Sequence, residues 1–370
     1  MPFEIDFLPV GTGERSGDAI AIRYAANGGH KILVYDGGTK ESGQALVDHV
    51  RTYYGTDFVD DVVNSHPDND HASGLSVVME QLRVGTLWMH QPWNHSHLIC
   101  SYFKDGRITS ESLARRLQEK MRAAYDLELI AQRRRIQIKE PFQGDQIGLF
   151  HVLSPSREWY VHDLIPAFEK SPEVKQAEEI AAPGQAYAFL KALAEAARNG
   201  LTWVAERWDV ELLREDVETS AENESSVILY GHMQEDQEGL LLTGDAGIRG
   251  LNVAADYLES HQISAPQHVK FIQVPHHGSR HNVSTSTLDR LVGPKLLLPT
   301  GDGSKVAYVS ASAESKTHPR KMVTNAFIRR GARVIATQGQ KKCYSRGMPG
   351  RQGWGPATPM TFSNQVEGWE

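Results

Sequence analysis

The sequence predicts an α/β protein with a large buried core. Segments with the two-residue period of strands alternate with segments of helical period, most regularly after residue 225. Hydrophobic residues make up 40% of the 370 residues, which is enough for a sizeable core, and charged residues make up 23%. These proportions exclude disorder as the dominant state of the chain.

Composition also limits the compartment and the partners. Lys+Arg 39 and Asp+Glu 46 give a net charge of -7, so the chain lacks the basic surplus typical of sequence-independent nucleic-acid binding. The longest apolar runs are too short to cross a bilayer, and the first residues do not resemble a signal peptide. Cys100 and Cys343 are the two cysteines, so we expect neither a disulfide framework nor a thiolate metal cluster. We therefore expect a cytoplasmic protein without membrane contact.

The first ninety residues predict alternating strands and helices, beginning with strands. Phe3, Ile5 and Phe7 alternate with polar residues, as in a half-buried strand, and Asn27-Gly-Gly29 is a strong hairpin signal. The expected strands cover residues 3–7, 18–24, 31–35 and 59–64, and the expected helices cover residues 44–52 and 74–82.

Two helical stretches in the middle of the chain look like insertions. Residues 110–135 place Leu113, Leu117 and Met121 on one stripe, and their opposite face is basic. Residues 166–217 are also helical in period, and their polar residues are mostly acidic. We interpret both polar faces as solvated surface, with contact between the basic face and a phosphate backbone as the alternative.

The remaining elements alternate between strand and helix. A strand is expected at 147–153, ahead of the second insertion, and the others follow residue 225. Later strands are expected at 226–231, 239–243, 269–274, 295–299, 306–310 and 333–336, and later helices at 250–260, 285–291 and 320–330.

The most informative segment is His66-Pro-Asp68-Asn-Asp70-His71, which lies between an expected strand and an expected helix. A tight loop after a strand can direct several side chains at one point. Imidazole and carboxylate are the usual ligands of divalent zinc, manganese or iron. The alternative is an acidic turn that caps the helix, with the histidines incidental.

Two later segments favour the metal interpretation. Asp245 follows the apolar strand of residues 239–243, and His276 with His277 follows the strand of residues 269–274. Strands that end in ligand-type residues are what a metal site at one edge of a sheet requires. Asp245 is placed to bridge two cations, and His318 is a further candidate at the start of a helix.

These motifs, in this order, resemble the metallo-β-lactamase superfamily, and more narrowly the hydrolase domain of ComEC-type DNA-uptake competence proteins and its free-standing relatives. Gly17-Asp-Ala-Ile20, Asp36-Gly-Gly38 and Asn223-Glu-Ser-Ser226 are similar to further landmarks of that family. The resemblance implies a four-layer αββα sandwich. It would form one domain over residues 1–340, with helical insertions at about 106–140 and 158–221 and a C-terminal tail at 341–370.

The resemblance also implies a dinuclear site. One cation would be held by His66, Asp68, Asp245 and one of His276 or His277, and the other by Asp70, His71, Asp245 and His318. Asp70 and His318 are the candidate catalytic residues, with Asp70 orienting the attacking water. Asp36 is expected to support a ligand or a turn.

This chain departs from the superfamily's common pattern at two positions. Asp68 stands where the common motif has a second histidine, and a further histidine has no clear equivalent near Asn223. His90, His95 and His97 are alternatives for that missing ligand, against a plain surface loop. The site is rich in oxygen donors, so two divalent ions are expected, zinc first, with manganese or iron as alternatives.

The implied activity is hydrolysis by a metal-bridged hydroxide, with a phosphodiester of a nucleic acid or of a small molecule as the first expectation. Lactone or thioester hydrolysis is an alternative, because the fold does not select the substrate. The other alternative is a catalytically silent metal-binding protein whose helical insertions dock a protein partner. The sequence does not determine the oligomeric state.

Overall fold

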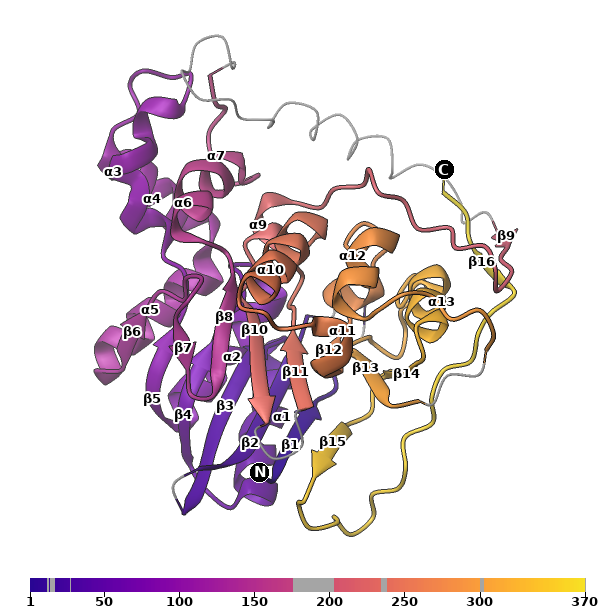
Figure 1. Ribbon diagram of the computed structural model, residues 1–370. Coiled ribbons are helices and arrows are strands. Elements are labelled where there is room, and N and C mark those ends of the chain that lie inside the picture. Colours follow the sequence, from indigo (N-terminus) through magenta and orange to yellow (C-terminus); the bar gives the residue numbers. More distant parts are fainter. Residues whose placement is uncertain are drawn as a thin grey trace.

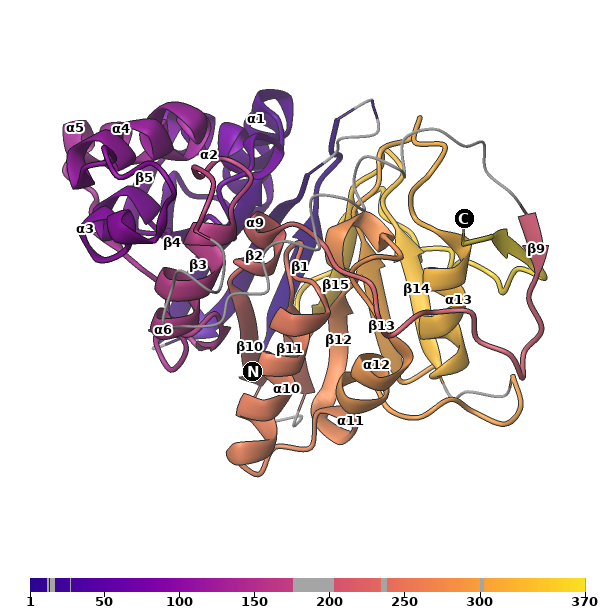
Figure 2. The ribbon, with the colours of Figure 1, turned by 90° about the horizontal axis from the view of Figure 1, so that it is seen from above.

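The computed structural model describes residues 1–11, 13, 17–26, 28–175, 203–233, 238–299 and 303–369. Within these ranges the chain forms two seven-stranded sheets that face each other and carry helices on their outer surfaces (Figure 1). Seen from above, α1, α2, α4 and α5 lie on one side and α10 to α12 on the other (Figure 2). The expected αββα sandwich is therefore confirmed.

The first sheet is built from the N-terminal third of the chain and one strand near the C-terminus. Its order is β15-β1-β2-β3-β4-β5-β6, with parallel pairing from β3 to β6. The strands are β1 (Phe3–Phe7), β2 (Ala19–Ala26), β3 (Gly29–Gly37), β4 (Phe58–Val63), β5 (Arg83–Trp88), β6 (Gln137–Lys139) and β15 (Lys342–Arg346).

The second sheet has the order β14-β13-β12-β11-β10-β8-β7, with parallel pairing from β11 to β14. Its strands are β7 (Gln146–Ile147), β8 (Phe150–Ser154), β10 (Ile228–Met233), β11 (Glu238–Leu242), β12 (Val269–Gln273), β13 (Lys305–Val309) and β14 (Ala332–Ala336). A small ribbon pairs β9 (Trp203–Ala205) with β16 (Gln365–Glu367).

The helices flank these sheets or join their strands. The longer ones are α1 (Lys40–His49), α2 (Asn69–Gln81), α4 (Ser110–Lys120), α5 (Arg122–Arg134), α10 (Ile248–Ser260), α12 (Thr285–Leu291) and α13 (Lys321–Arg329). The short ones are α3 (Ser96–Ile99), α6 (Arg157–Trp159), α7 (Ile165–Ala167), α9 (Ala221–Glu224) and α11 (Ala265–His268). None of the described helices is long and apolar enough to cross a membrane.

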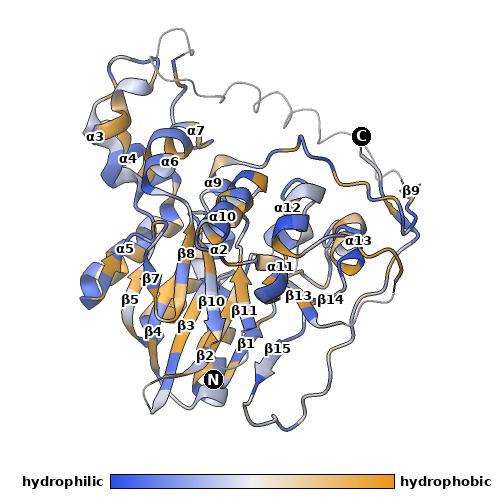
Figure 3. Cartoon of the chain, in the orientation of Figure 1, coloured by the Kyte–Doolittle hydropathy of each residue, from blue (hydrophilic) through white to orange (hydrophobic). Residues whose placement is uncertain are grey.

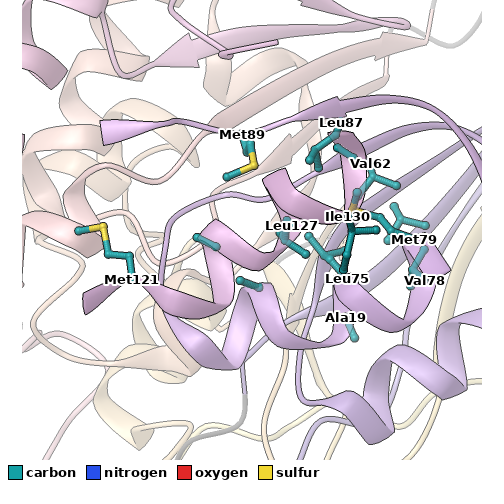
Figure 4. Close-up of a cluster of buried hydrophobic side chains, with 14 of the residues drawn as sticks. Ala19, Val62, Leu75, Val78, Met79, Leu87, Met89, Met121, Leu127 and Ile130 are labelled. Atoms are coloured by element: carbon teal, nitrogen blue, oxygen red, sulfur yellow. The ribbon is translucent and has the colours of Figure 1, made fainter. Parts of the chain in front are cut away.

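Three apolar layers hold the sandwich together. The middle layer lies between the sheets and includes Phe7, Phe271 and Tyr308, whose rings pack against one another. The hydrophobic colouring of Figure 3 follows the strands of both sheets. One outer layer packs α2 and α5 on the first sheet, where Leu75 and Leu127 face its strands (Figure 4). Burial of this apolar surface fixes the strand ends that carry the site.

Several predicted elements differ in the structure. The helix expected at 110–135 breaks at Met121, whose backbone leaves the helical region (φ -107°, ψ 46°), and the strand expected at 147–153 is a β7–β8 hairpin. Helix α2 begins at Asn69 instead of residue 74, so Asp70 and His71 lie in its first turn.

Two other predictions are wrong. Residues 295–299 form no strand, because they do not pair with either sheet. Leu296 N donates its hydrogen bond to the Arg329 carbonyl, and the Leu297 side chain is 95% exposed. Helical structure was expected through residue 217, but residues 203–205 form β9 and the segment up to 217 is irregular. The alanine-rich part of that insertion, residues 176–202, lies outside the described residues.

The segment expected to be a tail is attached to the domain. Strand β15 pairs with β1 along its whole length, and Val366 in β16 is fully buried. The Glu367 carboxylate accepts hydrogen bonds from the backbone of Lys321 at the start of α13. Residues 342–346 thus complete the first sheet, and residues 365–367 support a helix of the second.

Candidate metal centre

The candidate site lies where strands of both sheets end. Asp36 is near the end of β3, and His66 and Asp68 are in the loop between β4 and α2. Asp245 follows β11, and His277 follows β12, in the other sheet. Because β3 and β4 are parallel, and β11 and β12 are also parallel, each pair delivers its side chains at one end of its sheet.

The Asp245 carboxylate is the centre of this site. Its Oδ2 atom lies 3.3 Å from His71 Nε2, 3.7 Å from His276 Nε2, 3.8 Å from His277 Nε2 and 3.9 Å from His66 Nε2. Four imidazole nitrogens from two separate segments, residues 66–71 and 276–277, therefore surround one carboxylate oxygen.

Two further carboxylates complete the group. Asp68 Oδ2 lies 3.8 Å from His66 Nε2. Asp70, His71 and His277 each offer a ligand atom within 4.8 Å of the other two. Seven of the eight residues that the sequence nominated as metal ligands thus meet at this place, which divides into a His66 side and an Asp70 side; the eighth, His318, lies at its edge.

The outward-facing nitrogen of each histidine has a partner. These Nδ1 contacts fix the ring orientation and turn Nε2 toward Asp245. The partners are Ser65 Oγ for His66 (2.9 Å), Asp36 Oδ2 for His71 (2.8 Å), the side chains of Asn223 and Asn282 for His276 (3.1 Å each) and the Ser310 carbonyl for His277 (3.2 Å).

The inward-facing atoms are buried but unsatisfied. Among the described residues, His66 Nε2, His71 Nε2 and Asp245 Oδ1 have no hydrogen-bond partner. Leaving one buried polar atom unpaired costs about 1–3 kcal/mol, so several of them converging on one point indicate a missing common partner. A divalent cation fits this donor set, because it is bound by imidazole nitrogen and carboxylate oxygen.

Electrostatics agree with this interpretation. Burial alone would lower the pKa of His71, but the Asp245 and Asp36 carboxylates raise it well above its usual value. Burial alone would raise the pKa of Asp245, but His71, His276 and His277 hold it well below its usual range. The carboxylates that favour a proton on His71 would also attract a divalent cation.

Three residues of the candidate site have strained backbone conformations. Asp36, His276 and His277 all have positive φ values, of 56°, 46° and 55°. Such values are uncommon for residues other than glycine and persist only where the surroundings impose them. The hydrogen bonds of Asp36 to Ser65 (2.7 and 2.6 Å) supply part of that constraint.

Asp18 is a site residue that the sequence analysis did not nominate. It is buried at the start of β2, and its carboxylate lies within 4.8 Å of ligand atoms of His71 and Asp245. Burial, assisted by Asp245 and opposed by His71, raises its pKa to about 7. The sequence feature that could have pointed to Asp18 is its position beside Gly17, directly before a buried strand.

The remaining candidates lie outside this group. His318 stacks on His276 with 6.4 Å between ring centroids, at the edge of the site. His90 stacks on Tyr160, and His95 Nε2 pairs with Glu140 at 2.9 Å, so both are packed against residues of the insertions. His97 is exposed on α3. The 223–226 segment reaches the site through Asn223, which contacts His276.

A two-sheet αββα fold with a cluster of histidines and aspartates at its strand ends defines the class of metal-dependent hydrolases. Comparison with known families gives the same class: residues 12–109 match the family model of the metallo-beta-lactamase superfamily. Over this range the chain is similar to that superfamily. No curated protein matches the sequence.

Solved structures show more distant likenesses. The metallo-beta-lactamase SMB-1 bound to 2-mercaptoethanesulfonate is 9% identical, with 78% of this chain and 86% of that chain covered and a TM-score of 0.31. MEM-A1, a subclass B3 metallo-beta-lactamase from a soil metagenome library, is 12% identical (78% and 85% covered, TM-score 0.30). Igni18, a metallo hydrolase from the archaeon Ignicoccus hospitalis, is 11% identical (94% and 100% covered, TM-score 0.34).

Proposed function

We propose that the cluster holds two divalent cations and that the chain is a metal-dependent phosphodiesterase. One observation carries the metal part: four imidazole Nε2 atoms lie 3.3–3.9 Å from Asp245 Oδ2, and two of them, those of His66 and His71, have no hydrogen-bond partner in the described part of the chain. The residues proposed as ligands are His66, Asp68, Asp70, His71, Asp245, His276 and His277.

The chemistry of the donors supports this assignment. Asp245 lies between the two sides of the cluster and is placed to contribute to both cations. Asp68 adds an oxygen donor on the His66 side, so zinc is the first expectation and manganese or iron the alternatives. Bound divalent cations would supply Lewis acidity and a water of lowered pKa.

The surrounding residues would guide the reaction. Asp70 is partly exposed, and its carboxylate is close to His71 and His277, where it can accept a proton and orient a water molecule. His318 lies beside His276 at the edge of the site and is placed to contact substrate.

The basic face of the insertion favours small phosphodiesters over nucleic-acid strands. Arg133 is paired with Glu80, Arg134 donates to the Met79 carbonyl, and Arg122 pairs with Asp126. Side chains engaged in this way are not arranged as an open track for a phosphate backbone.

The test is cleavage of bis(p-nitrophenyl) phosphate by protein stripped with chelator and then supplied with zinc, manganese or iron. We expect turnover only with metal, and a loss of at least about 100-fold in kcat for Asp70→Ala. Asp48→Ala, which changes an exposed carboxylate on α1, is the matched control and should leave kcat unchanged.

Two outcomes would contradict the proposal. Binding of metal without turnover of the phosphodiester would favour a silent binding protein or, if a lactone or thioester is cleaved, another hydrolase. Loss of cleavage of single-stranded DNA on charge reversal at Arg133, with cleavage of the small substrate unchanged, would contradict the preference for small phosphodiesters over nucleic-acid strands.

A further inference from the structure

The two helical insertions form one unit in the described residues. Lys104 N donates to the Glu173 carbonyl and Lys175 N to the Tyr102 carbonyl, both at 2.9 Å, so a short antiparallel bridge joins the second insertion to the residues directly before the first. The Tyr102 hydroxyl also contacts His162 Nδ1 at 2.8 Å. The segment around residue 170 is therefore held by the residues directly before the first insertion as well as by its own backbone.

This joined unit brings one lysine to the candidate metal centre. Lys170 Nζ lies 2.9 Å from Asp68 Oδ1 and 3.2 Å from Glu222 Oε1. From α4, Arg116 Nε donates to the Lys170 carbonyl at 3.0 Å and fixes the backbone at this point. The Lys170 side chain is 27% exposed and the Glu222 side chain is fully buried, so the contact is largely shielded from water.

The Asp68 carboxylate has two differently placed oxygens. Oδ1 accepts from Lys170, while Oδ2 lies 3.8 Å from His66 Nε2. With Oδ1 held by an ammonium group, the carboxylate cannot rotate freely, and Oδ2 stays directed at the cluster. Hydrogen bonds of this kind orient ligating carboxylates in metal sites.

We propose that Lys170, delivered by the joined insertions, is a positioning residue that holds Asp68 as an oxygen ligand on the His66 side of the metal centre. This inference rests on the proposed function. It gives the insertions a role in building the site. It also explains how Asp68 can be a metal ligand at the position where the common motif of the superfamily has a histidine. Lys170 acts through Asp68 and is not itself a ligand.

The charge balance permits cation binding beside a lysine. Asp68 and Glu222 each carry -1 and Lys170 carries +1, so the three groups together still attract a cation. Repulsion between the ammonium and a metal ion would be reduced by the carboxylate that lies between them. If Lys170 acts by orienting Asp68, removing the lysine should weaken zinc binding. If it acts mainly by repelling the cation, removing it should strengthen zinc binding. The direction of the change in zinc affinity therefore tests the proposal.

The experiment measures zinc affinity of the full chain by competition with a chromophoric chelator, together with zinc per chain by elemental analysis. For Lys170→Met we expect one of the two zinc ions to bind about 10–100-fold more weakly. Lys170→Gln keeps a hydrogen-bond donor and should lose less. Lys120→Met, on the exposed side of α4, is the control and should match wild type.

A second pair of variants leaves the ammonium in place. Arg116→Met removes the contact with the Lys170 carbonyl. It should weaken the binding of the same zinc ion, by a smaller factor than Lys170→Met does. Arg115→Met, at an exposed neighbouring position, should have no effect. This pair keeps the proposal testable even if Lys170→Met fails to fold.

The inference is overturned if Lys170→Met binds both zinc ions as wild type does, or more tightly. In that case wild-type zinc binding still supports the metal centre, and only the role of Lys170 is lost. A wild-type chain that binds no divalent ion overturns the proposed function and this inference together.

Discussion

Asp36 organises the histidines from outside the cluster. Its Oδ2 lies 2.8 Å from His71 Nδ1, and it accepts from both the backbone N and the Oγ of Ser65. Ser65 Oγ in turn lies 2.9 Å from His66 Nδ1. One fully buried carboxylate therefore fixes two imidazole rings, although it is not among the proposed ligands.

Asp36→Asn should weaken zinc binding about 10–100-fold, because an amide cannot accept from all three donors and would let the His71 ring turn. Competition with a chelator measures this change directly. Asp48→Asn, on the exposed face of α1, should match wild type. Unchanged affinity in Asp36→Asn would show that packing alone orients the rings.

At the level of elements, helix α2 is held close to the first sheet by glycines. A Cβ on Gly74 would lie 1.9 Å from the Gly37 carbonyl oxygen and 2.5 Å from that of Thr39. A Cβ on Gly43 in α1 would lie 2.2 Å from the Gly74 carbonyl oxygen. The two helices and the end of β3 thus meet backbone to backbone, directly below the turn of α2 that carries the site.

Gly74→Ala should therefore push α2 away from β3 and displace Asp70 and His71. We expect a loss of about 3 kcal/mol or more in the free energy of unfolding, since the added carbon meets backbone that cannot move aside easily. Urea unfolding measures the stability, and chelator competition should show weaker zinc binding in the same variant. Gly106→Ala, where a Cβ meets nothing within 4 Å, is the control.

The elements show why part of the site could be predicted from sequence. Asp245 and His277 were found because each follows a buried strand, and strand period and strand ends are local features. Lys170 was not nominated, because its contact with Asp68 spans 102 residues and depends on how two insertions pack. The strand expected at 295–299 failed for a related reason: an apolar run becomes a strand only when a sheet offers it a partner.

At the scale of the whole molecule, a buried polar network joins the two ends of the described chain. Asp6 in β1 accepts from Arg351 Nη1 and Nη2 at 2.6 and 2.8 Å, and it also lies 3.0 Å from His49 Nε2. Arg351 pairs with Glu4 as well, at 2.7 Å. The segment after β15 is thereby fastened across the first sheet, on strand β1 and helix α1.

The Asp6 network should make the stability of the whole fold depend on pH. Burial alone would raise the pKa of Asp6, but His49 and Arg351 hold it well below its usual value. Because the unfolded carboxyl titrates near about 3.9, the stabilisation is fully present above that pH and is lost as the pH falls toward the folded pKa.

Asp6→Asn should therefore lose about 3 kcal/mol of unfolding free energy at pH 7, because it removes the buried carboxylate that pairs with both Arg351 and His49 and leaves Arg351 with Glu4 alone. The difference from wild type should begin to shrink as the pH falls below about 4, because protonation of the unfolded carboxyl then removes part of the stabilisation that the ionised Asp6 supplies. Urea unfolding at pH 7, 5 and 3 measures both effects. Asp57→Asn breaks an exposed pair with Arg83 and should show little difference at any pH, because solvent screens that pair. A deficit in Asp6→Asn that stays constant down to pH 3 would mean that shape, and not charge, makes Asp6 important.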